Sequence, residues 1–532
     1  MPSWRTSELV VNIVLAVTGG NPSCSEVISA IQDHLPALYF TFSRGKTELL
    51  AEEMGREWDF LLPGEKNRVK RILREAEDTQ PGLFGPRRGK LRQLLTQGIA
   101  YHHAGLSPAL KDLVERLYEA RLIYALFCTE TFAVGVNFPA ASTVFDSCRK
   151  WDGREFRGLI NREFFQMAGR AGRRGFDPVG RVYVRIDERF PEQTGFYNED
   201  EVEPVRGRLI ISPNTVLSLL YWKTDEEINR FLEQNLAVYQ NNREGRKIKR
   251  ELAELDEKLH EIEKAFCDRV DTPACYMMRV KLKKELRSLA RKNKRGRPGT
   301  RERREEIRKM LKTAQKKCHH RPCSEARKRQ ADLMERKSRL VRRMRILGNH
   351  SRDYERDFNR VWDLLEDLSY VDGRNLLPRG IFALHLHVQE ILVTELVFNG
   401  FIRDMPPAPV AAILAGVDYV PGRDDSVAPG PYDLREVESL RRTLLRSGVP
   451  ENFCVWSPLP GPLAAAWYEG ASFDQLLSVT NLQEGDIFSI IRREIDLLRQ
   501  IERAAGEDTE LRRQMEHIRK RLDRDEVAIP GI

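Results

Sequence analysis

The segment Gln166–Gly175 combines fixed positive charge with glycines and reads Gln-Met-Ala-Gly-Arg-Ala-Gly-Arg-Arg-Gly. Arg170 and Arg173 would share one face if this segment were helical. Each guanidinium is permanently charged and can bind phosphate oxygens through two parallel N–H groups. The glycines allow another backbone or a phosphate to approach closely. Arginines held in this way suit phosphoryl transfer, because they stabilise negative charge on the transferred group.

The other groups that an ATPase site needs are missing from the sequence. There is no G-x-x-x-x-G-K-[ST] phosphate loop and no D-E-x-H box. Gly45-Lys46-Thr47 has the end of a phosphate loop, but Phe40 stands where the first glycine belongs. Asp525–Ala528 begins like an acidic box and ends in alanine. Both are interpreted as chance matches to short patterns.

Length and composition indicate a large globular chain. At 532 residues with 41% hydrophobic residues, it should hold about three to four domains of roughly 150 residues. The eight cysteines form no disulfide-like framework, which predicts a reducing, cytoplasmic location. No apolar run reaches the roughly 18 residues of a membrane span. Leu9–Val17 is short, interrupted by Asn12 and preceded by Glu8, so a buried strand or helix is expected rather than a signal peptide.

Positive charge is concentrated in one region of the chain. Residues 241–350 contain 36 Lys and Arg against 16 Asp and Glu, a net charge of +20, whereas the whole chain carries +9. A basic segment on a mildly acidic body favours a polyanionic partner. The alternative is an ordinary solvated helical face.

Residues 1–200 alternate between strand and helix patterns. The expected strands are Ala37–Phe42, Ile99–Tyr101, Leu122–Phe127, Thr143–Phe145 and Val182–Ile186. Ser43 can cap one helix, and Ser107-Pro108 can begin another that runs to Ala120. This alternation predicts an α/β domain with a parallel sheet and helices on both faces, whose ligands gather at the carboxyl ends of the strands.

Residues 241–350 are expected to form a basic coiled-coil arm. Apolar residues recur at heptad spacing at Ile248, Leu252, Leu255, Leu259, Ile262 and Phe266. Lys292–Thr300 would be the tip, and the seam returns through Leu333, Leu340, Met344 and Leu347. The simplest structure is one long antiparallel helical hairpin.

The arm is predicted to be inserted in a winged helix. Residues 201–240 would form its start and residues 351–390 its remainder, with a wing hairpin at Leu376–Gly380. Residues 391–532 are expected to be an all-α domain, apart from a Pro/Gly-rich loop at Val420–Pro431.

Several further segments carry a family resemblance. Phe42-Ser43-Arg44, Tyr101–Leu106 (YHHAGL) and Thr129–Pro139 (TETFAVGVNFP) precede Gln166–Gly175 in that order. Together they resemble the motifs of superkiller-type, exosome-associated DExH-box helicases of superfamily 2. Glu484-Gly485-Asp486 and the following Arg492–Gln500 resemble the helical domain that closes this family.

The resemblance implies a division of roles within the chain. Residues 1–200 would be the second RecA-like domain, with Arg170 and Arg173 as arginine fingers and Gln166 orienting the nucleotide. Gly135, Asn137 and Gly169 would lie near the ATP. The residues implied to contact a nucleic-acid strand are Ser43, Arg44, Gly105, Thr129, Thr131, Arg492 and Arg493. Backbone contacts of this type suit tracking without base readout.

Simpler roles are open for some of these residues. His102 and His103 are expected to make turns or hydrogen bonds rather than to catalyse. Thr129 could merely cap a helix, and Arg492 and Arg493 could be surface charges. Cys267, Cys275, Cys318 and Cys323 could approach one another across the arm, but their spacing departs from zinc sites and no metal site is predicted.

The sequence therefore predicts the C-terminal half of an ATP-dependent RNA or DNA helicase acting on single-stranded or partly duplex substrates. ATP and Mg²⁺ would be held mainly by a first RecA-like domain, expected on a partner polypeptide, so the chain by itself should be inactive. A truncated reading frame is a further explanation. The alternative function is a non-enzymatic nucleic-acid-binding adaptor or a decayed helicase fragment.

Overall fold

The fold was analysed in a computed structural model. It describes residues 8–14, 22–85, 87–133, 140–172, 177, 179–185, 202–264, 266, 275–293, 300–313 and 321–528. The chain divides into two units. The first comprises Met1–Val205, Ser212–Tyr221 and Leu364–Ile532, and the second comprises Arg206–Ile211 and Trp222–Asp363.

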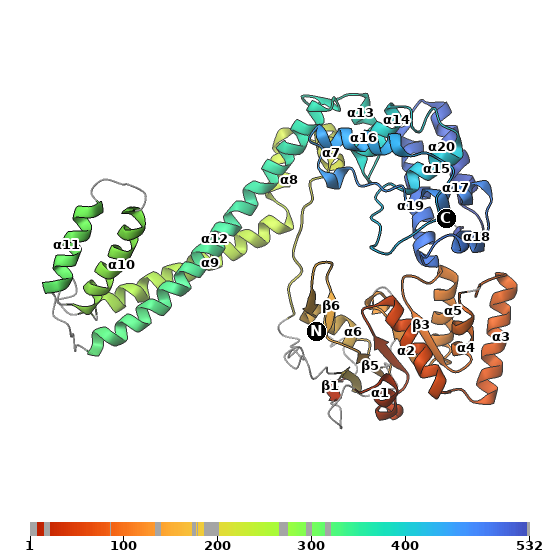
Figure 1. Ribbon diagram of the computed structural model, residues 1–532, viewed down its shortest axis with the longest axis horizontal. Coiled ribbons are helices and arrows are strands. Elements are labelled where there is room, and N and C mark those ends of the chain that lie inside the picture. Colours follow the sequence, from red (N-terminus) through yellow and green to blue (C-terminus); the bar gives the residue numbers. More distant parts are fainter. Residues whose placement is uncertain are drawn as a thin grey trace. The chain divides into compact units, whose positions relative to one another are not determined.

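The α/β part (residues 8–185) is built on a parallel sheet of six strands in the order β1-β8-β5-β2-β4-β3 (Figure 1). The strands are β1 Glu8–Val14, β2 Ala37–Phe40, β3 Ile99–His102, β4 Ala125–Cys128, β5 Ser142–Phe145 and β8 Val179–Arg185. All the strands expected from the sequence are present, with ends shifted by one to three residues, and Leu9–Val14 lies in a strand rather than a helix.

Helices connect these strands: α1 Cys24–Ala30, α2 Arg44–Glu57, α3 Pro63–Thr79, α4 Gly89–Leu95, α5 Pro108–Glu119 and α6 Asn161–Ala168. The predicted caps are confirmed, since Ser43 accepts from the Lys46 amide and Ser107 from the Leu110 amide. The strand order runs outward from β2 to β3 and then back through β4 to β5, so right-handed crossovers place α2–α4 and α5 on opposite faces. Strands β2 to β5 are buried along their whole length, as a sheet covered on both faces requires.

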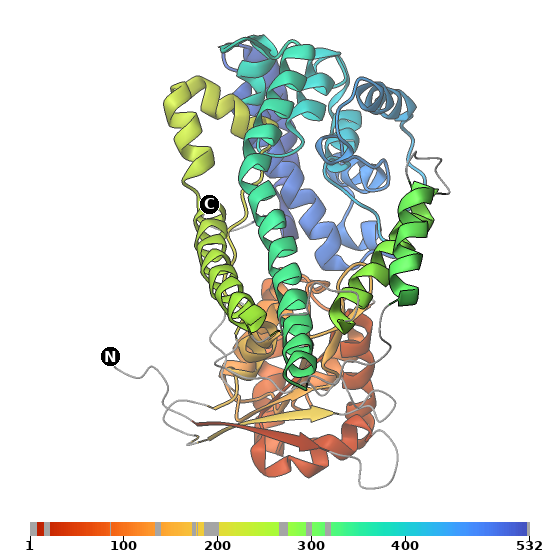
Figure 2. The same ribbon diagram turned by 90° about the vertical axis from the view of Figure 1, so that its left-hand side faces the viewer.

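The second unit contains α8 Asp225–Glu233 and the helices of the basic arm: α9 Leu236–Lys264, α10 Tyr276–Asn293, α11 Thr300–Thr313 and α12, which extends over Arg321–Asp367. Helices α9 and α12 lie side by side, and α10 and α11 form a second pair (Figures 1 and 2). The heptad seam is confirmed at Ile248, Leu255 and Leu259, which are buried. The expected return of the chain is found between α10, which ends at Asn293, and α11, which begins at Thr300, but α9 ends at Lys264 and α10 begins at Tyr276, so the described residues do not form one helix on each side.

The predicted wing hairpin at Leu376–Gly380 is also wrong. The two-stranded hairpin lies earlier, at β9 Val371–Asp372 and β10 Asn375–Leu376, with Gly373 at φ +55° in its turn. Pro378 starts helix α13, Pro378–Ala383, instead of a strand. Proline is favoured in the first turn of a helix because its missing N–H has no partner there anyway. The winged helix as a whole stays a prediction.

The helical part (residues 378–528) contains α13, α14 Glu390–Phe398, α15 Pro407–Ala415, α16 Arg435–Arg446, α17 Gly461–Glu469, α18 Phe473–Ser478, α19 Glu484–Ala504 and α20, Thr509–Leu522. Helix α7, Pro213–Trp222, joins it through Asn214, whose side chain donates to the carbonyls of Leu384 and Leu386. The long helix α19 packs against α15 and α20. Residues 420–431 form the predicted loop. Among the described helices, none is long and apolar enough to cross a membrane.

Candidate functional site

Most of the residues expected to contact a nucleic-acid strand come directly after three neighbouring β-strands of the sheet. Strand β4 lies between β2 and β3, and Cys128 pairs in register with both Phe40 and His102. Ser43, Thr129 and Gly105 come one to three residues after these paired positions. Because parallel strands end at the same edge, the three segments meet at the carboxyl edge of the sheet.

Thr129 and Thr131 present hydroxyl groups at this edge. Their Oγ1 atoms lie 2.9 Å apart, and Thr131 is exposed. The Thr129 amide donates to the His102 carbonyl, and its own carbonyl accepts from Phe132 in the short 3-10 turn Glu130–Ala133. The two hydroxyls can therefore donate to phosphate oxygens without breaking the backbone that holds them.

Ser43 and Arg44 begin helix α2. Ser43 is exposed, and its hydroxyl caps the helix. Arg44 reaches into the helical part, where its guanidinium donates to both carboxylate oxygens of Asp486 at 2.8 Å and to Gln483 at 3.3 Å. Arg44 is thus already an ion-pair partner within the protein, which the sequence did not indicate.

Gly105 also contacts the helical part. Its N–H donates to His103 Nδ1 at 3.1 Å, and its carbonyl accepts from the Gly485 amide at 3.0 Å. A Cβ on Gly485 would lie 2.0 Å from the Ala104 carbonyl oxygen. Gly485 is therefore required by the close approach of two backbones, whereas a Cβ on Gly105 would meet the side chain of Gln483.

The predicted nucleotide-binding residues surround the end of α6. Gln166 and Gly169 are exposed and three residues apart, whereas the helix ends at Ala168. The shared helical face assumed for Arg170 and Arg173 therefore does not exist at Arg170. Arg170 is half-buried, and burial lowers its pKa. Arg173, Gly135 and Asn137 lie outside the described residues.

Arg170 is tied to the segment that carries Thr129. Its guanidinium donates to the carbonyl of Ala133, at the end of the turn that starts beside Thr129. The Arg170 carbonyl in turn accepts from the Ala140 amide at 2.9 Å. Arg170 thus contacts the segment 129–133, which also carries the hydroxyls of Thr129 and Thr131.

Arg492 and Arg493 are placed differently on α19. Arg492 is largely buried and donates to Asp523 at 3.0 Å and to the Val527 carbonyl at 3.2 Å. Arg493 is exposed and donates to the Asp418 carbonyl at 3.2 Å. Of the two, Arg493 is the one whose charge is available at the surface.

A buried cluster that the sequence did not reveal joins the two parts. Arg88, only 4% exposed, donates to Glu48 at 2.8 Å, to Glu484 at 2.9 Å and to Tyr101 Oη at 3.2 Å. His103 Nε2 lies 2.9 Å from Glu48. Because His103 Nδ1 accepts from Gly105, the ring proton sits on Nε2 and donates to Glu48.

The electrostatics of this cluster fit that arrangement. Burial lowers the pKa of His103, which favours the neutral ring. Burial acts to raise the pKa of Glu48, but the hydrogen bonds from His103 and Arg88 outweigh it and the pKa is lowered. Burial raises the pKa of Glu484, although Arg88 opposes the shift. Glu484 is therefore the carboxylate of the cluster that takes up a proton first as the pH falls.

Arg87 adds a contact of a different kind. Its guanidinium donates to the backbone carbonyls of Leu477, Thr480 and Leu482, around the end of α18. The carboxyl end of a helix attracts cations, because its last carbonyls have no partner within the helix. Together, Arg44, Arg87 and Arg88 (the arginine clasp) hold residues 477–486 of the helical part.

A second feature missed by the sequence analysis is the hairpin of β6 Arg149–Trp151 and β7 Phe156–Gly158. Trp151 is 53% and Phe156 62% exposed, and their rings meet edge to face at 5.3 Å. Lys150 anchors the hairpin through Glu130 at 2.7 Å and Glu163 at 2.9 Å. Two exposed aromatic rings on a basic hairpin are suited to stacking on nucleobases.

The four cysteines that could approach one another and bind a metal ion lie in the arm. Cys275 and Cys323 are buried, whereas Cys267 and Cys318 lie outside the described residues. Within the described ranges, no group of three His, Cys, Asp or Glu side chains could hold a metal ion.

Comparison with known proteins identifies both parts of the first unit. The helicase conserved C-terminal domain matches residues 65–175, and the DSHCT (NUC185) domain matches residues 374–529. These two domains on this fold define the C-terminal half of a superfamily-2 helicase. The matched segments are similar to superkiller-type (Ski2-like), exosome-associated DExH-box helicases, and they support the C-terminal half of such a helicase.

The curated relatives are much longer proteins. Human superkiller complex protein 2 is 34% identical over 236 residues, which are 43% of this chain and 18% of that protein. Mouse exosome RNA helicase MTR4 is 35% identical over 233 residues, or 42% of this chain and 22% of that protein. Arabidopsis thaliana DExH-box ATP-dependent RNA helicase DExH11 is 41% identical over 162 residues, covering 30% and 12%. The chain thus matches at most about a fifth of the length of these relatives.

Proposed function

We propose that this chain supplies the second RecA-like domain and the strand-guiding helical domain of an ATP-dependent RNA helicase. The observation that carries this proposal is the meeting of Ser43, Gly105 and Thr129 at one edge of the sheet, beside the amino end of α19. RNA is proposed as the substrate because the relatives above are named RNA helicases.

In the nucleotide site, Arg170 and Arg173 act as arginine fingers. ATP is held by a first RecA-like domain whose phosphate loop and acidic box are not in this sequence, on the same polypeptide or on a partner chain. That domain also provides the ligands for Mg²⁺. Arginines in this role stabilise charge on the transferred phosphoryl group, and Gln166 and Gly169 line the approach to it.

On the RNA side, the strand runs along the carboxyl edge of β2, β4 and β3. Ser43, Thr129 and Thr131 donate hydroxyl hydrogen bonds to its phosphates, and Arg493 adds charge from α19. Trp151 and Phe156 offer stacking surfaces for bases. The Arg170–Ala133 hydrogen bond supports coupling, because movement of Arg170 toward ATP would displace the segment that carries Thr129 and Thr131.

The proposed domains are residues 1–200 for the RecA-like domain, 201–240 and 351–390 for a winged helix, 241–350 for the arm and 391–532 for the helical domain. The winged helix is supported by helix α7 and the β9–β10 hairpin. We place the protein in a reducing compartment, the cytoplasm, on the basis of its cysteines.

The test supplies a first RecA-like domain from a family member in trans and measures RNA-stimulated ATP hydrolysis. Arg173→Ala should lower the maximal rate by roughly 10³- to 10⁵-fold with RNA affinity nearly intact. Thr129→Ala should instead weaken RNA binding by about fivefold, the effect of roughly 1 kcal/mol for one lost hydrogen bond. Arg71→Ala, on the exposed face of α3, removes the same charge as a control.

Full turnover by Arg173→Ala would refute the arginine-finger role. If the chain bound RNA but no ATPase activity returned with the added domain, the non-enzymatic adaptor would become the better function. The chain by itself is expected to show no RNA-stimulated ATPase, because it carries no phosphate loop.

A further inference from the structure

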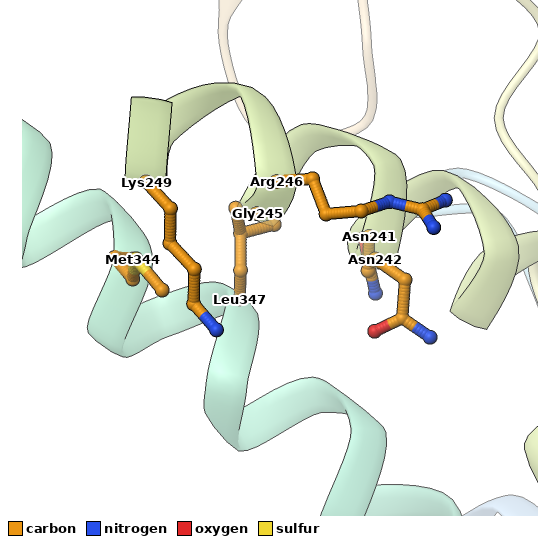
Figure 3. Close-up of a pocket in the computed structure, with 7 residues that line it drawn as sticks. All are labelled: Asn241, Asn242, Gly245, Arg246, Lys249, Met344 and Leu347. Carbon is orange, nitrogen blue, oxygen red and sulfur yellow. The ribbon is translucent and has the colours of Figure 1, made fainter. Parts of the chain in front are cut away.

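A groove lies between helices α9 and α12 of the arm, with a volume of about 400 Å³ (Figure 3). Its walls are Asn241, Asn242, Arg246 and Lys249 from α9, and Met344 and Leu347 from α12. Figure 3 shows Lys249 extending toward α12, while Arg246 extends along α9. The groove therefore has a basic and amide rim on one helix and an apolar wall on the other.

Gly245 forms part of the wall of the groove. An ideal Cβ on this residue would meet no atom within 4 Å. Glycine inside a helix costs about 1 kcal/mol relative to alanine. Neither a tight turn nor a close backbone contact explains glycine here, since Gly245 lies inside α9 (Leu236–Lys264). Gly245 leaves open space between α9 and α12 that a larger side chain would fill.

The cations of the groove differ from their neighbours on the arm. Elsewhere α9 and α12 are joined by the ion pairs Glu244–Arg343, Glu251–Arg336 and Asp256–Lys337. Within the described part of the chain, by contrast, Arg246 and Lys249 have no ion pair or side-chain hydrogen bond. Among the described residues that line the groove there are two cations and no carboxylate.

The two asparagine side chains that line the groove resemble its cations in having no side-chain partner among the residues that the structure describes. In the described residues, the side chains of Asn241 and Asn242 form no hydrogen bond either. Four polar side chains that line one groove are thus available together. Amides donate and accept at once, which suits the edge of a base or a sugar hydroxyl rather than a simple anion.

We propose that this groove binds one or two nucleotides of a single-stranded RNA segment, in a site separate from the path along the sheet. Arg246 and Lys249 bind phosphates, a base lies against Met344 and Leu347, and Asn241 and Asn242 contact its edge or the ribose. The volume lies in the range of ligand-sized pockets. The net charge of +20 over residues 241–350 favours a long polyanion that continues along the arm.

This site rests on the proposed function for the identity of its ligand, but it is tested without ATP. The test measures binding of a short oligouridylate to the full chain by fluorescence anisotropy over a series of salt concentrations. Gly245→Met fills the groove, and methionine is a good helix former, so the arm should remain folded. Binding should weaken roughly five- to tenfold, as expected from one lost base contact.

A pair of charge-matched variants separates the groove from general basicity. Arg246→Gln with Lys249→Gln removes two cations that line the groove. Lys247→Gln with Arg250→Gln removes two exposed cations from the same turn of α9 that do not line it. Only the first pair should reduce the slope of log affinity against log salt by about 1.4, because each phosphate contact on a single strand contributes about 0.7.

Equal losses in the two charge pairs, or unchanged binding in Gly245→Met, would overturn the site. If Gly245→Met weakened binding of polyglutamate but not of the oligonucleotide, the groove would be an acidic-peptide site instead. An intact trans-complemented ATPase together with unchanged binding would refute the groove and leave the proposed function standing. A chain that binds no oligonucleotide at all would refute both.

Discussion

The arginine clasp allows a direct measurement of what burial contributes to an ion pair. Arg88–Glu484 and Arg44–Asp486 join the same two parts of the protein at 2.9 and 2.8 Å. The side chains of the first pair are 5% and 8% exposed, and those of the second are 41% and 33% exposed. The two ion pairs are of similar length and differ strongly in burial, and Arg88 in addition donates to Glu48 at 2.8 Å.

The two pairs should respond very differently to truncation. Arg88→Met leaves the buried Glu484 carboxylate without a cation, which typically costs 3–5 kcal/mol. Arg44→Met breaks a partly exposed pair, for which about 0–1 kcal/mol is expected. The double variant Arg88→Met/Glu484→Leu removes the buried unpaired charge of Glu484 as well, so much of the loss should be recovered, although Glu48 still lacks its contact with Arg88.

One backbone amide reports on this contact directly. The Gly485 N–H donates across the interface to the Gly105 carbonyl at 3.0 Å, so it exchanges its hydrogen with solvent only when the two parts separate. Hydrogen–deuterium exchange of a peptide covering residues 483–487 therefore measures the opening free energy. At about 1.4 kcal/mol per factor of ten, Arg88→Met should speed this exchange by roughly two to three and a half orders of magnitude. Arg44→Met should speed it less than about fivefold.

Strand β5, Ser142–Phe145, serves as the internal control, since its exchange should not change if the sheet remains folded. Less than about tenfold faster exchange at Gly485 in Arg88→Met would refute the reasoning that this buried pair holds the interface. Equal effects of Arg44→Met and Arg88→Met would refute the role given to burial.

Three further predictions follow from other features. Glu494 is buried with no hydrogen-bond partner for either carboxyl oxygen among the described residues, so Glu494→Leu should stabilise by about 1–3 kcal/mol in urea unfolding. Burial raises its pKa well above 4.5, so the wild type should lose stability as the pH rises from 4.5 through the folded pKa; a leucine variant with the same pH slope would contradict this. Trp151→Ser with Phe156→Ser should weaken single-stranded RNA binding by about 1–3 kcal/mol per lost stack, with the melting temperature unchanged because both rings are exposed. Gly485→Ala forces a methyl group against the Ala104 carbonyl and should lower the melting temperature by several degrees; a shift under about 1 °C would count against the close packing.

Local sequence signals predicted the α/β part well. The caps at Ser43 and Ser107 and the apolar strands each depend on a few neighbouring residues, so they can be recognised without the rest of the chain. The meeting of Ser43 and Thr129 at one edge followed from the rule that parallel strands end together. Their proposed roles depended on the family motifs and remain predictions.

Contacts between distant residues could not be predicted in this way. Arg88 and Glu484 are 396 positions apart, and neither periodicity nor charge pattern links them. The heptad seam of the arm gave its core positions but not the helix ends at Lys264 and Tyr276, because a seam records which face is buried and not where a helix stops. At Leu376–Gly380 the sequence was expected to form a hairpin, although its proline favours the first turn of a helix.

The contact made by Arg87 has a consequence for how this interface varies among related proteins. Its three acceptors are backbone carbonyls, which every residue type provides. Substitutions at Leu477, Thr480 or Leu482 therefore leave the acceptors in place, whereas any change of Arg87 removes the donor. In an alignment of relatives, exchanges at Arg44 and Asp486 should occur together, but Arg87 should vary without any correlated partner. A search for interface contacts based on covariation would miss this one.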